Sequence, residues 1–165
     1  MQTVQKIAPC LWFDHQAEEA ANFYVGIFRN SKIVDVVRYG KAGQEITGGK
    51  PGSVMTVSFE LDGNAFTALN GGPLFKFNEA ISLQVFCKTQ EEIDHFWDRL
   101  GAGGDRKAEQ CGWLKDKYGL SWQIVPTIVP ELMTDPDAAK RDRVMAAILK
   151  MKKIDIAALQ QAAGR

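Results

Sequence analysis

The chain has 165 residues, of which 45% are hydrophobic and 24% are charged, so we expect one globular domain with a sizeable core. Its 20 basic and 20 acidic side chains cancel, which argues against a general nucleic-acid or anionic-membrane binder. No apolar run is long enough for a signal peptide or a transmembrane helix. The three cysteines show no paired spacing, as is usual for reduced thiols in the cytoplasm, where we expect the protein.

The first half of the chain predicts a strand, a helix and then three strands. The apolar run 7–13 predicts a buried strand, and apolar residues at helical spacing predict a helix over 16–28. Further strands are expected at 33–39, 55–61 and 65–69, with a glycine-rich loop over 40–52. Asp62-Gly63 between two apolar runs is a strong hairpin signal.

The second half repeats this order more briefly. A strand is expected at 81–87 and a helix from about Gln90 to Leu100, for which Thr89 and Glu92 form a capping box. A short strand at 105–108 and two longer strands at 110–115 and 120–125 should follow.

The tail of the chain predicts helices rather than strands. Thr134-Asp135-Pro136 is typical of a helix start, and residues 154–163 indicate a second short helix. The apolar stripe of Val144, Ile148 and Met151 indicates core packing, with a partner-binding face as the alternative.

Two stretches that lie 73 residues apart are nearly the same. Residues 13–24 read FDHQAEEAANFY and residues 86–97 read FCKTQEEIDHFW, so that Phe13 matches Phe86 and Phe23 matches Phe96. A repeat at a fixed offset indicates one supersecondary unit used twice. We therefore expect a single domain, 1–165, made of a first module, a second module and a helical extension at 1–72, 73–129 and 130–165.

The familiar cofactor motifs are incomplete in this chain. The glycines at 101–104 follow a helix, and Gly48-Gly49-Lys50 is followed by proline where a P-loop needs serine or threonine. The two histidines, His15 and His95, are not spaced to share a metal. No cofactor is therefore predicted.

Cys111-Gly112-Trp113 is the most suggestive local cluster. The glycine permits close backbone approach, the tryptophan can stack on a flat ligand, and nearby lysines would lower the thiol pKa. Cys111 is thus a candidate catalytic residue. The alternative is a buried strand cysteine beside a core tryptophan.

Several segments together resemble one protein family. These are IAPCLWFD, EEAANFY, NSKI, FTALNGGPLFKFNEAIS, QEEIDHFWDRL, CGWLKDKYGLSWQIVP and MKKIDIAAL. They resemble the PhnB-like, or demethylubiquinone methyltransferase-like, family of the vicinal-oxygen-chelate superfamily of glyoxalases, bleomycin-resistance proteins and dioxygenases. The resemblance implies an α+β fold in which two βαβββ modules form curved mixed β-sheets around a cavity, with C-terminal helices, in a homodimer.

The resemblance also implies where metal ligands would stand. Metal-using members place His, Gln or Glu on the first and last strands of each module, and the matching positions here are Ala8, Thr67, Ile81 and Gln123. Alanine and isoleucine cannot bind a metal, and threonine and glutamine are weak neutral ligands. No metal is therefore predicted.

The sequence favours a cytoplasmic small-molecule-binding protein. With Ala8 facing the cavity, strand alternation places Cys10 and Trp12 on the same side, pairs Ile81 with Leu83, and pairs Gln123 with Ser121. The residues expected around one shared pocket are Cys10, Trp12, Thr67, Asn70, Cys111, Trp113 and Gln123. The alternatives are an enzyme, namely a lyase, isomerase or transferase, using Cys111 or an unconventional metal site, and a protein-interaction module acting through the C-terminal helices.

Overall fold

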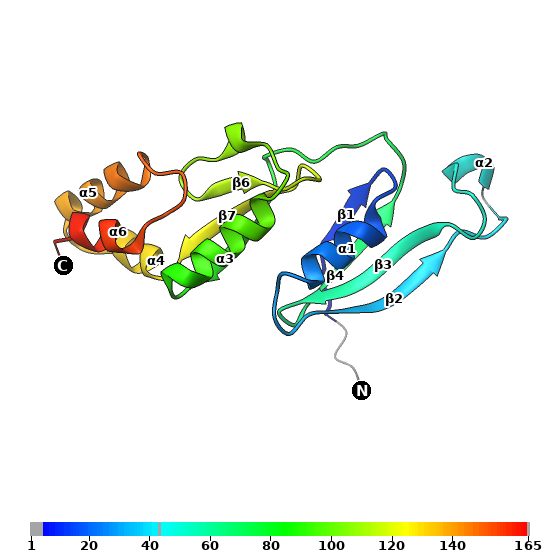
Figure 1. Ribbon diagram of the computed structural model, residues 1–165, viewed down its shortest axis with the longest axis horizontal. Helices are drawn as coiled ribbons and strands as arrows, with labels where there is room; N and C mark the ends of the chain where they lie inside the picture. Colours follow the sequence, from blue (N-terminus) through cyan, green and yellow to red (C-terminus); the bar gives the residue numbers. More distant parts are fainter. Residues whose placement is uncertain (1–4, 43, 165) are drawn as a thin grey trace. The chain divides into compact units, whose positions relative to one another are not determined.

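The computed structural model describes residues 5–42 and 44–164, and the chain divides into two compact units, Met1–Lys76 (unit 1) and Phe77–Arg165 (unit 2). Each described unit contains one β-sheet with a helix across one face (Figure 1). No helix within these described ranges is long and apolar enough to cross a membrane.

Unit 1 has the expected β-α-β-β-β order. Its elements are β1 (Cys10–Phe13), α1 (Ala17–Val25), β2 (Lys32–Arg38), the one-turn α2 (Gln44–Thr47), β3 (Val54–Leu61) and β4 (Asn64–Asn70). The strands lie in the order β1-β4-β3-β2, with β1 parallel to β4. Helix α1 packs on this sheet through Tyr24, whose ring stacks on that of Phe59 with centroids 6.4 Å apart.

The hairpin between β3 and β4 is confirmed. Leu61 pairs with Asn64 across it, and the two residues of the turn, Asp62 and Gly63, have φ of 46° and 75°. A two-residue turn with positive φ at both positions matches the twist of the flanking strands. This turn fixes the register of β3 against β4.

Unit 2 has a smaller sheet in the order β5-β7-β6. Its elements are β5 (Ser82–Cys87), α3 (Gln90–Gly101), η1 (Arg106–Ala108), β6 (Trp113–Lys115) and β7 (Ser121–Pro126). The capping box is formed, because the Thr89 hydroxyl accepts a hydrogen bond from the Glu92 amide while the Glu92 carboxylate accepts one from the Lys88 amide. Helix α3 buries Ile93, Trp97 and Leu100 against the sheet.

The strand expected at 105–108 is wrong, since these residues form the 3₁₀-helix η1. The Asp105 carboxylate accepts a hydrogen bond from the Lys107 amide at 2.9 Å. Such a side-chain bond to the backbone two residues later favours a helical turn over an extended strand. In the described residues the second module therefore has three strands instead of four.

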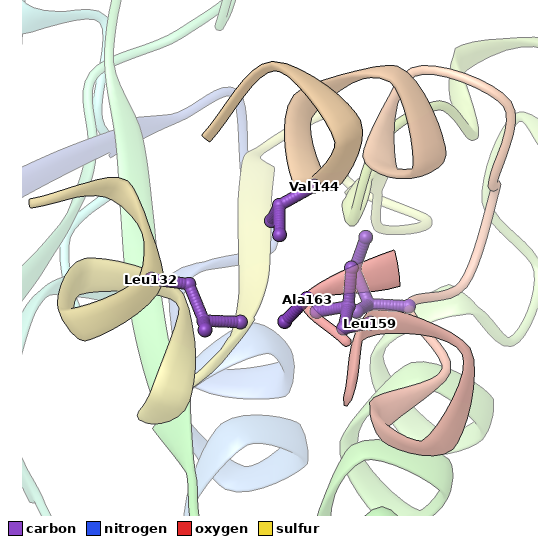
Figure 2. Close-up of a cluster of buried hydrophobic side chains, with 5 residues drawn as sticks. Leu132, Val144, Leu159 and Ala163 are labelled. Atoms are coloured by element: carbon purple, nitrogen blue, oxygen red, sulfur yellow. The ribbon is translucent and has the colours of Figure 1, made fainter. Parts of the chain in front are cut away.

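The C-terminal extension is helical, as expected, and it contains one helix that the sequence did not predict. Its helices are α4 (Ile128–Met133), α5 (Ala138–Ile148) and α6 (Ile156–Ala162). Helix α4 was not expected, and its Pro130 stands in the first helical turn, where proline is tolerated. The three helices share a buried cluster, shown in Figure 2, of Leu132, Val144, Ile154, Leu159 and Ala163.

Candidate functional site

The sheet of unit 1 has one face that α1 does not cover. In the parallel β1–β4 pair, Cys10 lies opposite Thr67 and Leu11 lies opposite Ala68. Leu11 and Ala68 are buried on the helix side, so strand alternation places Cys10 and Thr67 on the other side. Trp12 lies on this side too, as predicted. We call this surface the open face of unit 1.

Trp12 is held firmly on this open face. Its Nε1 donates a hydrogen bond to the Gly72 carbonyl at 2.9 Å, and its ring meets the edge of the Phe75 ring at a centroid distance of 4.9 Å. A Cβ on Gly71 would lie 2.3 Å from the indole ring, so only glycine permits this close approach. The half-buried indole is therefore pre-oriented as an apolar surface.

Asn70, also a predicted site residue, has a structural role instead. Its Oδ1 accepts a hydrogen bond from the Ala17 amide at 2.8 Å, and its Nδ2 donates one to the Val54 carbonyl. Gln16, at the N-cap of α1, makes no side-chain cap bond. Asn70 thus caps α1 from the end of β4, on the helix side of the sheet.

The sheet of unit 2 has a corresponding open face, and it carries a network of uncharged polar groups. Gln123 on β7 donates from Nε2 to the Ser82 hydroxyl at 2.8 Å. Gln84 on β5 donates from Nε2 to Gln123 Oε1 at 3.4 Å. Trp113 lies directly opposite Gln123 in the β6–β7 pair, so its half-buried indole flanks the same network.

The expected register of β5 is wrong by one residue. Leu83 lies opposite Trp122, which is buried on the helix side, whereas Gln84 lies opposite Gln123. Neither Ile81 nor Leu83 therefore shares the open face. Ile81 precedes the strand, which begins at Ser82.

This error has a simple origin in the links between strand and helix. The helices repeat at an offset of 73, from Ala17 to Gln90, but the strands end 74 residues apart, at Phe13 and Cys87. The link between β5 and α3 is one residue shorter than the link between β1 and α1. An alignment based on the two helices therefore places every side chain of β5 on the wrong face of the sheet. Phe86, the expected match of Phe13, is accordingly exposed while Phe13 is buried.

The corrected offset reveals two polar residues that sequence reasoning missed. At an offset of 74, Gln84 is the counterpart of Cys10, so the Gln84–Gln123 pair of unit 2 corresponds to the Cys10–Thr67 pair of unit 1. Ser82 joins the same face. The length of this link becomes visible only once the pairing of β5 with β7 is known, so the sequence alone carried no signal for these two residues.

Cys111, the candidate catalytic residue, lies in a tight turn. Its φ is 53° and that of Gly112 is 83°, and Gln110 pairs with Trp113 across them. The Cys111 amide donates to the Met151 carbonyl at 2.8 Å and the Gly112 amide donates to the Lys152 carbonyl at 2.7 Å. The turn therefore anchors the C-terminal extension through its backbone.

The other two cysteines have raised pKa values. Burial raises the pKa of the Cys10 thiol, and burial, followed by the charge of Glu92, raises the pKa of Cys87 to about 12. Both thiols are therefore protonated at neutral pH, where only a thiolate is a strong nucleophile. These shifts do not favour thiol catalysis at either position.

The resemblance to metal-using proteins implies metal ligands on the first and last strands of each unit. In the observed pairing Cys10, rather than Ala8, lies opposite Thr67, and Gln84, rather than Ile81, lies opposite Gln123. These four positions offer a protonated thiol, a hydroxyl and two amides. Divalent ions prefer imidazole and carboxylate ligands in closed sets. In the described part of the chain, no three His, Cys, Asp or Glu side chains come together as a metal-binding group. The residues present do not fit a divalent metal.

This chain is similar to known proteins in both sequence and structure. A family model described as 3-demethylubiquinone-9 3-methyltransferase matches residues 5–125. The chain belongs to this family. A PhnB protein from Bacillus cereus, described as a 3-demethylubiquinone-9 3-methyltransferase, is 38% identical with a TM-score of 0.63, and the match covers 74% of this chain and 100% of that one. The expected PhnB-like family is thereby confirmed.

Two more distant solved structures also match. Protein PA1353 from Pseudomonas aeruginosa is 16% identical with a TM-score of 0.56, covering 74% of this chain and 97% of that one. A glyoxylase/bleomycin resistance protein/dioxygenase domain from Frankia sp. EAN1pec is 13% identical with a TM-score of 0.47, covering 75% and 93%. No curated protein matches the chain.

The family match ends within β7. Helices α4, α5 and α6 follow it, so the C-terminal extension lies outside the region that the family model describes. The anchor at Cys111 and Gly112 joins this extension to the family fold.

Proposed function

We propose that this protein is a cytoplasmic small-molecule-binding protein that holds a ligand on the open face of unit 1. The observation that carries the proposal is the pre-oriented indole of Trp12, which is fixed by the Gly72 carbonyl and the Phe75 ring yet remains half-exposed. Ligand sites combine apolar aromatic surface with a few placed polar groups. Thr67 and the exposed Cys10 supply such groups beside the indole.

A thermal-shift screen against metabolites tests the proposal, because a ligand that binds only the native state raises its stability. For the best ligand, Trp12→Ala should weaken binding by about 1–3 kcal/mol through lost contact area. Trp12→Phe should weaken it less. Ile46→Ala is the matched control, because this apolar side chain is 91% exposed on α2, and its variant should bind like the wild type.

The comparison must be made on folded protein, since Trp12 also contributes to packing. Circular dichroism at the screening temperature establishes that each variant is folded. A ligand that binds folded Trp12→Ala as tightly as the wild type would contradict a site at this indole. If no metabolite in the complete screen raised the melting temperature of the protein, this result would contradict the binding function itself.

The proposed binding does not use a divalent metal at the superfamily position. Its support is the neutral donor set around Gln84 and Gln123. Elemental analysis of purified protein should find no stoichiometric zinc, iron or manganese. One metal per chain that is lost in Gln123→Ala would show this to be wrong.

We also propose a homodimer. Two-fold dimers are the commonest soluble oligomers, and each unit has a sheet face that its own helix leaves uncovered. Sedimentation at micromolar concentration should give about twice the chain mass of 18.3 kDa. A single species at the chain mass would contradict the proposal.

A further inference from the structure

The open face of unit 2 holds more hydrogen-bonding capacity than its own network uses. Gln123 and Gln84 each donate one hydrogen bond within the network, and a terminal amide can make two as donor and two as acceptor. Ser82 accepts a bond from Gln123, which leaves its hydroxyl proton available for donation. Either orientation of the Gln84 amide presents both an N–H and an oxygen on this exposed side chain.

A buried hydroxyl on the same face is without a partner. Ser121 is 1% exposed, and its Oγ has no hydrogen-bond partner among the described residues. It lies directly opposite Ser82 in the β5–β7 pair, two residues before Gln123 and therefore on the same face. A buried polar atom without a partner is unfavourable, so a ligand that enters between the side chains covering Ser121 and hydrogen-bonds its hydroxyl gains from satisfying it.

The face is electrically balanced. Lys115, which lies opposite Ser121 on β6, forms an ion pair with Glu79, the residue three positions before β5. The Lys115 hydrogen bond keeps the pKa of Glu79 below its usual value, so this carboxylate stays ionised at neutral pH beside Lys115. The charge of Lys115 is thus already matched, and the remaining polar groups are neutral.

We propose that this face, formed by Ser82, Gln84, Ser121 and Gln123 beside Trp113, binds an uncharged planar ring that carries a carboxamide or lactam group. Such a group offers a donor and an acceptor in one plane, which is the complement of a glutamine amide. The Trp113 indole supplies the apolar surface for the ring. An ionised ligand would have to leave water without a countercharge here. This inference rests on the proposed small-molecule function and adds a ligand class for the open face of unit 2.

Benzamide and benzoate are the probes that test it, because they match in size and differ in charge. Titrations of the full chain should be followed by the ¹⁵N NMR signals of the side-chain amides of Gln84 and Gln123. Benzamide should shift both signals saturably, and benzoate should bind at least about tenfold more weakly. Gln123→Leu should weaken benzamide binding at least about tenfold, while Gln44→Leu, at an exposed glutamine on α2, should not.

Ser121→Ala separates a ligand contact from a structural role. The hydroxyl has no partner to lose, so the variant should be at least as stable as the wild type in urea while binding benzamide more weakly. A loss of stability with unchanged binding would overturn the role given to Ser121 and with it the proposed site.

The remaining outcomes distinguish this inference from the broader function. Benzoate binding as tightly as benzamide, or benzamide leaving both glutamine signals unmoved, would overturn the ligand class. If a ligand from the metabolite screen still depends on Trp12 in that case, the small-molecule function stands. If that screen finds no ligand either, both proposals fail.

Discussion

Units 1 and 2 share a central pattern and differ at the edge of the sheet. In each unit the first strand lies parallel to the last, and a helix covers the side of the sheet that carries the apolar residues. In unit 1 a long edge strand, β2, completes a four-stranded sheet, whereas unit 2 has the turn η1 at the corresponding place in the chain. The repeat therefore preserves the parallel pair and the helix face, and it leaves the edge free to change.

Among the described residues, unit 2 lacks this edge strand, but it makes contacts with the C-terminal extension that have no counterpart in unit 1. The amides of Cys111 and Gly112, next to β6, donate to carbonyls of the C-terminal extension. The Gln90 side chain donates to the Ile154 carbonyl and accepts from the Ile156 amide. The Ile154 side chain is buried in the cluster of the C-terminal helices, which disfavours a partner-binding role for this residue.

The largest expected effect concerns the turns before the last strand of each unit. Unit 1 uses the two-residue turn at Asp62 and Gly63, whereas unit 2 uses the buried carboxylate of Asp116, which is 2% exposed. This carboxylate accepts hydrogen bonds from Trp122 Nε1 at 2.8 Å and from the Leu120 amide at 3.0 Å. Asp116→Ala leaves these donors buried without a partner, so we expect a loss of about 3 kcal/mol in the free energy of unfolding, measured in urea.

Asp62→Asn provides the matched change in unit 1. Asparagine tolerates positive φ well, so this variant should lie within about 0.5 kcal/mol of the wild type. Equal losses for Asp116→Ala and Asp62→Asn would mean that the two turns do not differ in the way that their contacts indicate.

The next effect compares how the two helices are capped. Asn70 caps α1 from another strand and also bonds the Val54 carbonyl, whereas Thr89 caps α3 locally. Asn70→Ala removes two partly buried hydrogen bonds and should cost about 2 kcal/mol. Thr89→Ala should cost about 1 kcal/mol, the usual value for a lost N-cap.

Urea denaturation measures both variants, and Gln16→Ala serves as the control because Gln16 makes no cap bond. If Gln16→Ala destabilised the protein as much as Asn70→Ala, the assignment of the α1 cap to Asn70 would be wrong.

The smallest effect on stability at neutral pH is expected at the buried last residue of the first strand in each unit. Phe13 stands there in unit 1 and Cys87 in unit 2. Because the pKa of Cys87 rises from 9.0 to about 12 on folding, only the unfolded chain loses this proton just above pH 9. The contribution to stability is therefore complete below pH 9 and should be lost as the pH rises toward 12.

Unfolding midpoints between pH 8 and 10.5 test this expectation. Cys87→Ala should show a smaller fall in stability with pH than the wild type, whatever its stability at pH 8. Cys10→Ala is the control: this residue is exposed and only partial burial raises its thiol pKa, so its variant should keep most of the fall. Parallel curves for the wild type and Cys87→Ala would contradict the raised pKa.

The sequence predicted what depends on local chemistry and helical spacing. The Asp62-Gly63 turn and the Thr89 cap are local, and the buried positions Ala20, Tyr24, Ile93 and Trp97 follow from helical periodicity. The register of β5 depends on pairing with β7, about 40 residues later, which no local pattern encodes. Ser82 and Gln84 were missed for that reason, whereas Trp12, Thr67, Trp113 and Gln123 lie on the predicted side of their strands.

The bonds between Gln90 and the extension bear on the order of events during protein synthesis. They join residues 64 and 66 positions apart, so α3 leaves the ribosome well before its partners at Ile154 and Ile156. The sheet of unit 1 is complete once Asn70 has emerged, and domains tend to fold as they appear. Unit 2 gains these contacts only after residues 154–156 have emerged, so a chain stalled before them would carry a finished first unit and an unfinished second one.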